Sequence, residues 1–429
     1  MNVPLLIMRI LFIILLTALL FPVLSAGAAD RPYPYTNAYR ATVYGTPPEL
    51  KHQIEDPVTP KERSIRIKGR NVPDIFSYSD QMFYTTALQR REAPLIFIVA
   101  GTGAEHDSAK MQFLVQVFYQ AGFHVVALSS PTHMNFVVSV SEHAVPGYVP
   151  HDVADLYRVM LWIKQDMEKR CEISGYSVTG YSLGALHSAF LAHMDSEKKD
   201  FNFEHVLMIN PPVSLYDSVR RLDGWLTSKS LDGRTVHEEL EHFINQFSVF
   251  YEHADVTDLD DNFLYELVTH IDLEEKDLKA LIGVDFRVSS SSMIFSSDVC
   301  KRAGYIVPPD AYPLGDGDPL MPYAESSFEI TFEMYLDEYL LPYLRYLYPT
   351  VDRATLLNQC SLRGITPYLR ETDKIMVIGN RDDVILDKND VEYIELVFGD
   401  RARLFPHGGH CGNMAYGPFV EAMVKMVKP

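Results

Sequence analysis

Short apolar runs alternate with amphipathic stretches along most of this chain. The clearest run, at 94–100, is apolar throughout and ends at Gly101, as is typical of a strand buried on both faces of a sheet. Further strands are expected at 64–68, 82–88, 124–129, 176–179, 205–210, 374–379 and 401–405. Helices are expected at about 107–120, 152–169, 183–193, 388–398 and from about 416. This alternation predicts an α/β fold with a mostly parallel sheet covered by helices on both faces.

The alternation stops between 213 and 370. Helical patterns recur there without strands between them, at 235–251, 263–281 and 328–348. We therefore expect a largely helical insertion at 213–370, placed at one edge of the sheet. The core is then made of two parts, 64–212 and 371–429, and the Pro- and Tyr-rich segment 29–63 is expected to form an extended arm over it.

The first thirty residues differ from the rest of the chain. Arg9 precedes an apolar run at 10–24, and small residues follow it at 25–29. This order is typical of a secretory signal peptide over 1–28, with Ala26-Gly27-Ala28 as the cleavage motif. The alternative is an uncleaved anchor, although the apolar run is short for a membrane span of roughly 20 residues. We expect an exported protein, periplasmic or secreted, with no stable membrane span after signal cleavage.

Charge and cysteine content narrow the possibilities further. The formal net charge of −19 argues against nucleic acid as a partner, because phosphate binding needs clustered Lys and Arg. Export permits disulfides, and among the four cysteines Cys300 and Cys360 are the preferred pair because they lie in the same segment. The alternative is four free thiols. The oligomeric state does not follow from the sequence.

The strongest candidate for chemistry is Gly180-Tyr181-Ser182-Leu183-Gly184, which fits the pattern G-x-S-x-G. An expected strand precedes it and an expected helix follows at once, the context of a nucleophile elbow. The glycines suit a tight turn in which the helix packs close to the strand. The amide of Leu183 would lie at a helix N-terminus, where it is free to donate to an oxyanion.

Three other segments place polar groups at expected strand ends. Gly101-Thr102 follows the strand at 94–100, and the side chains of Glu105, His106 and Asp107 lie just beyond, with no catalytic role assigned to them. Asp382 and Asp383 follow the strand at 374–379. The glycine-rich loop at 406–412, after the last strand, carries His407 and His410.

The order Ser, Asp, His, with each residue at a strand end, resembles the α/β-hydrolase family over residues 64–210 and 374–428. Two positions depart from the common pattern: Ala100 stands where many members carry His, and Gly379-Asn380 shifts a glycine by one place. The resemblance implies Ser182 as the nucleophile. It implies His410 as the base, in preference to His407. It implies Asp383 as the orienting acid, in preference to Asp382. The backbone amides of Thr102 and Leu183 would form the oxyanion hole.

The expected activity is that of a serine hydrolase cleaving a carboxylic ester, as an esterase, lipase or thioesterase, through an acyl-enzyme. Its substrate would be a small-molecule or lipid-like acyl compound, and no metal or organic cofactor is required. The insertion would form a cap, in which the aromatic stretch 328–348 is expected to pack against the body; the alternative is an aromatic wall for an acyl chain. Two other functions stay open: a serine peptidase or amidase on the same fold, and a non-catalytic binding protein.

Overall fold

The computed structural model describes residues 31–227, 231–243, 273–315 and 317–428. The expected signal peptide lies outside these residues, as do parts of the helical patterns expected at 235–251 and 263–281. Among the described residues, no helix combines the length and the apolar character needed to cross a bilayer.

One eight-stranded sheet forms the centre of the molecule, with the order β1-β2-β4-β3-β5-β6-β7-β8. Its strands are β1 (Lys61–Ile65), β2 (Met82–Ala87), β3 (Ala93–Val99), β4 (His124–Leu128), β5 (Ile173–Tyr181), β6 (His205–Ile209), β7 (Ile375–Asn380) and β8 (Ala402–Phe405). All pairings from β4 through β8 are parallel, whereas β2 runs antiparallel to both β1 and β4. The predicted α/β-hydrolase fold, with its mostly parallel sheet and flanking helices, is confirmed.

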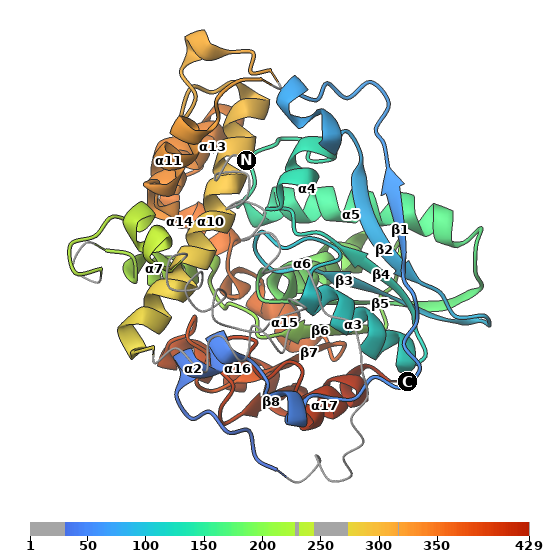
Figure 1. Cartoon of the computed structure of the whole chain (residues 1–429). Helices are drawn as coiled ribbons and strands as arrows, with labels where there is room; N and C mark the ends of the chain where they lie inside the picture. Colours follow the sequence, from blue (N-terminus) through green and yellow to red (C-terminus); the bar gives the residue numbers. More distant parts are fainter. Residues whose placement is uncertain (1–30, 228–230, 244–272, 316, 429) are drawn as a thin grey trace, which may run out of the picture.

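Helices cover both faces of this sheet (Figure 1). The helices of the core are α2 (Ala38–Tyr44), α3 (Ala109–Gln120), α4 (Met134–Ser139), α5 (Val149–Met167), α6 (Leu183–Lys198), α16 (Lys388–Phe398) and α17 (Gly417–Val427). Apolar side chains of α3 and α17 pack together on one face, and those of α5, α6 and α16 belong to a second cluster on the other. Parallel strands such as β3 are therefore buried on both sides, which explains their continuous apolar sequences.

The chain leaves the sheet after β6 and returns to it at β7. The helices between them include α7 (Leu215–Gly224), α10 (Glu275–Lys301), α11 (Met321–Phe328), α12 (Phe332–Met334), α13 (Leu341–Leu347), α14 (Arg353–Gln359) and α15 (Thr366–Glu371), with a π-helical turn at Tyr335–Leu340 joining α12 to α13. In Figure 1 the long helix α10 runs along the left of the molecule, with the strands of the sheet to its right. We call the segment 213–370 the cap.

The aromatic stretch of the cap packs inward. Phe332, Tyr335 and Tyr339 are buried in the larger apolar cluster, and the Tyr335 hydroxyl donates to the backbone oxygen of Pro146. Tyr346 at the far end is exposed. The buried part of the stretch, Phe332 to Tyr339, thus packs against the body of the molecule.

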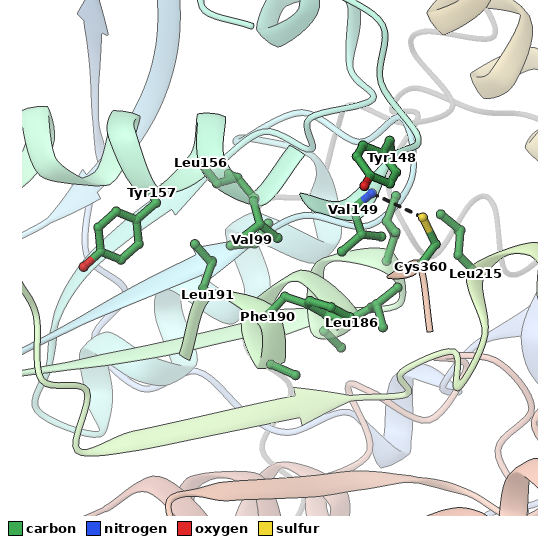
Figure 2. Packing of buried hydrophobic residues seen from close by; sticks show 14 of the residues in the cluster. Val99, Tyr148, Val149, Leu156, Tyr157, Leu186, Phe190, Leu191, Leu215 and Cys360 are labelled. Carbon is green, nitrogen blue, oxygen red and sulfur yellow. Dashed lines mark hydrogen bonds between the residues drawn. The ribbon is translucent and has the colours of Figure 1, made fainter. Parts of the chain in front are cut away.

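The expected disulfide between Cys300 and Cys360 is wrong, because all four cysteines are free thiols. Cys300 packs with the small apolar cluster around Val299 and Val307 at the end of α10. Cys360 lies in the main core, where the amide of Val149 donates to its sulfur at 3.4 Å (Figure 2). Proximity in the sequence therefore did not translate into proximity in the fold.

The core beneath β3 and α6 is dense. Figure 2 shows Val99 of β3 among Leu186, Phe190 and Leu191 of α6, with Leu156 of α5 close by. All of these side chains are buried. Such packing resists displacement, so it holds the end of β3 and the start of α6 in a fixed relation.

Candidate active site

A sharp turn joins β5 to α6 at Ser182, which has φ 54° and ψ −124°. A positive φ is rare for a residue with a side chain and costs on the order of 1–3 kcal/mol. The close approach of helix to strand requires the flanking glycines: a Cβ at Gly184 would collide with the backbone oxygen of Val99, and one at Gly180 with the backbone of Gly184. The tight turn between strand and helix that the sequence predicts is therefore present at Ser182.

His410 reaches the serine from the loop after β8. Its Nε2 lies 2.9 Å from the Oγ of Ser182, and its Nδ1 lies 3.0 Å from both carboxylate oxygens of Asp383. Burial by itself lowers the pKa of His410, but the neighbouring Asp383 carboxylate and Cys411, together with the hydrogen bonds to both, raise it above the ordinary value. The three side chains form one hydrogen-bonded chain from β5, β7 and β8, and the arrangement suits proton transfer from the hydroxyl to the ring.

The two adjacent acids have different partners. Asp383 is buried and accepts hydrogen bonds from the Asn210 side chain at 2.9 Å and from the amide of Ile385 at 3.1 Å, in addition to its contact with His410. Asp382 accepts from the amides of Gly408 and Gly409 instead. Asp383 therefore faces the imidazole, whereas Asp382 holds the loop that carries it.

His407 lies on the other side of that loop. Its Nδ1 is 3.5 Å from the carboxylate of Asp382, and its side chain is partly exposed. The structure brings His410, and not His407, to the serine.

Two supports of the site carried no recognisable signal in the sequence. Asn210 directly follows β6, has a φ of 47°, and its side-chain amide donates a hydrogen bond to Asp383. Thr42 of α2 accepts the backbone N–H of His410 at 2.9 Å through its hydroxyl, and a Cβ at Gly409 or Gly412 would collide with the backbone of α2. The segment expected to be an extended arm thus contains a helix that fixes the histidine loop.

Two backbone N–H groups are free to face an oxyanion. Within the described residues, neither the amide of Leu183 nor that of Thr102 makes a hydrogen bond. The neighbouring amides are occupied, because Gly103 donates to the Thr132 hydroxyl at 2.8 Å and Ala104 donates to the oxygen of Gly101 at 3.1 Å. The loop after β3 is therefore held in place while the predicted donor at Thr102 stays available.

The cap helix α10 lies against this loop. A Cβ at Gly103 would come within 2.6 Å of the Cβ of Ser289, so helix and loop are in close contact there. Asp285 precedes Ser289 by four residues and so shares its helix face. The Lys110 ammonium lies 5.9 Å from the ring of Tyr181, the residue that precedes Ser182. The cap helix therefore borders the loop that carries Thr102.

No family model and no curated protein matches this chain. Solved structures with a similar fold include the thioesterase domain from the curacin biosynthetic pathway (12% identity, 86% of this chain and 100% of that chain, TM-score 0.40). They also include an esterase of Pyrococcus furiosus (12%, 86% and 92%, TM-score 0.41) and a thermostable esterase of Pseudomonas putida (12%, 91% and 86%, TM-score 0.41). With TM-scores of 0.40 and 0.41 at 12% identity, these similarities carry no argument about the activity or the substrate of this chain.

Proposed function

We propose that the protein is a serine hydrolase that cleaves carboxylic esters through an acyl-enzyme. The observation that carries the proposal is the hydrogen-bonded chain Ser182–His410–Asp383, with 2.9 Å and 3.0 Å between the interacting atoms. The two free amides of Thr102 and Leu183 support it, because they supply the charge stabilisation that acyl transfer needs.

The reaction follows from these contacts. The Oγ of Ser182 attacks the ester carbonyl while Nε2 of His410 takes its proton, and the carbonyl oxygen becomes an oxyanion. The amides of Thr102 and Leu183 donate to that oxygen. Asp383 accepts the Nδ1–H of the ring, which fixes the tautomer and stabilises the imidazolium.

Release completes the cycle. The imidazolium gives its proton to the departing alkoxide, leaving the acyl group on Ser182. Water then attacks the acyl carbonyl, with Nε2 of His410 again accepting the proton, and the carboxylic acid leaves as the serine oxygen is reprotonated. Nothing in this sequence of steps calls on a metal or an organic cofactor.

The proposal extends to substrate and location. We infer that the substrate is a small-molecule or lipid-like acyl compound that binds beneath the cap. We also infer that the protein is exported, because its first thirty residues have the pattern of a signal peptide. A serine peptidase or amidase would use the same groups but would have to protonate a poorer leaving group, so esters are the first substrates to test.

Hydrolysis of p-nitrophenyl esters of increasing chain length tests the proposal. We expect activity from the wild-type protein and from Ser196→Ala, an exposed serine on the same helix, and none above background from Ser182→Ala. The chain-length profile then measures the acyl site. If the folded protein hydrolyses none of the esters, ester hydrolysis is contradicted, and an amide substrate or a non-catalytic role is the explanation to test next.

A further inference from the structure

A second group of chemically active side chains lies outside the triad, beside the loop that carries Thr102. Glu62 of β1, His106 and Asp107 each offer one ligand atom, and these atoms lie within 4.8 Å of one another. The strand register contributes to this arrangement. Glu62 is the direct partner of Thr85 in the antiparallel pair β1–β2, so both side chains point to the same face of the sheet.

His106 is oriented as metal-binding histidines usually are. Its ring is 1% exposed, and its Nδ1 lies 2.8 Å from the hydroxyl of Thr85. Its backbone N–H donates to the hydroxyl of Ser129 at 3.0 Å, which fixes the residue at the end of β4. With Nδ1 occupied, Nε2 is the nitrogen left to bind a ligand, and a fixed partner on the other ring nitrogen is the common outer-shell arrangement of metal sites.

The carboxylates of this group lack partners that would balance their charge. Oδ1 of Asp107 is buried and makes no hydrogen bond within the described residues. Among the residues that the structure describes, no Lys or Arg forms an ion pair with Glu62, Glu105 or Asp107. A buried acceptor without a donor is costly, and clustered carboxylates repel one another, so a bound cation would satisfy both.

We propose that Glu62, His106 and Asp107 form a binding site for a divalent transition-metal ion, with Zn²⁺ as the fitting ion. Imidazole nitrogen with two carboxylate oxygens suits Zn²⁺, whereas Ca²⁺ and Mg²⁺ prefer oxygen ligands alone. Zinc bonds of about 2.0–2.2 Å place tetrahedral ligands about 3.4 Å apart. The group must therefore contract slightly on binding, which the exposed side chain of Glu62 permits.

Such an ion would connect the edge strand β1 to the segment that follows the oxyanion loop. Asp107 lies two residues before the start of α3, and Thr102 lies five residues before Asp107. Zn²⁺ at this site would steady the loop without touching the reacting atoms. Its expected effect is a higher unfolding temperature, with the chemistry of Ser182 still possible in its absence.

Titration of metal-free, tag-free full-length protein with Zn²⁺ tests the site, by calorimetry and by thermal unfolding. We expect one equivalent to bind and to raise Tm, and Glu62→Gln and Asp107→Asn each to weaken binding at least about tenfold. These near-isosteric changes spare the buried histidine and so preserve folding. Glu92→Gln, an exposed acid close to the same sheet, is the matched control and should bind as the wild type does.

Co²⁺ as a second probe separates this site from binding by the free thiols. The Co²⁺ spectrum of the bound ion should lack the near-ultraviolet thiolate band. No binding at about 100 μM Zn²⁺, unchanged affinity in both variants, or a thiolate band would each overturn the proposal. Ester hydrolysis by the metal-free protein is measured alongside, so that failure of this site and failure of the hydrolase proposal are distinguished.

Discussion

Replacing Asp383 by Asn should separate the roles of two neighbouring acids. The side chain accepts three hydrogen bonds, from Asn210, from the amide of Ile385 and from the Nδ1–H of His410. An amide in its place can turn its NH₂ group toward Nδ1. The ring must then carry its proton on Nε2, facing Ser182 Oγ at 2.9 Å, and can no longer accept the serine proton.

The magnitude follows from losing the correct tautomer. A wrong tautomer costs roughly 10⁴-fold in kcat, which corresponds to about 5.4 kcal/mol of transition-state stabilisation. The matched variant, Asp382→Asn, keeps the size of the side chain beside the amides of Gly408 and Gly409. It should cost less than about tenfold in kcat, because the Asn side-chain oxygen can still accept one of the two amide hydrogen bonds and a typical lost hydrogen bond contributes only about 1 kcal/mol.

The difference in kcat between the two variants is measured by steady-state hydrolysis of one p-nitrophenyl ester. Circular dichroism checks that both variants are folded. The reasoning is refuted if Asp382→Asn loses more activity than Asp383→Asn, or if both lose little.

Three more outcomes follow from the same geometry. First, kcat/KM should fall as the pH drops through the pKa of His410, because the protonated ring cannot accept the serine proton. The neighbouring Asp383 helps to raise that pKa above its ordinary 6.5, so the acid limb of a pH–rate profile should move to lower pH in Asp383→Asn. An acid limb that does not move would contradict this. Second, Asn210→Ala should cost about 1.5–3 kcal/mol by removing a hydrogen bond to a charged group, seen in both kcat and Tm, and a variant with unchanged kcat would show that Asn210 does not position the acid. Third, Gly184→Ala should destabilise the fold by about 1–3 kcal/mol through its collision with Val99, measured by urea unfolding, and full stability would show that the elbow can relax.

The sheet could be predicted because its central strands are buried on both faces. Continuous apolar sequences as short as those of β3 and β6, bounded by turn residues, are typical of strands covered by helices on both sides. Their observed bounds, Ala93–Val99 and His205–Ile209, lie within a residue of those expected. The tight turn at Ser182 could also be predicted from local sequence, because the strand, the G-x-S-x-G pattern and the following helix are adjacent along the chain.

The cap and the supports of the site depend on long-range contacts that local patterns do not encode. A run of serines at 289–292 lies inside α10, where the hydroxyls of Ser290, Ser291 and Ser296 donate back to backbone oxygens of the helix. The contact between Thr42 and His410 spans 368 positions. The disulfide prediction failed because spacing along the chain says nothing about distance in space.

Labelling with a fluorophosphonate probe tests the central claim most directly. The reagent reacts with a serine only when a base activates the hydroxyl and an oxyanion hole receives the phosphoryl oxygen, so it reports Ser182, His410 and the two free amides together. We predict one adduct by intact mass, mapped to the peptide containing Ser182 and absent from Ser182→Ala. A folded wild-type protein that stays unlabelled, or an adduct at another serine, would contradict the account.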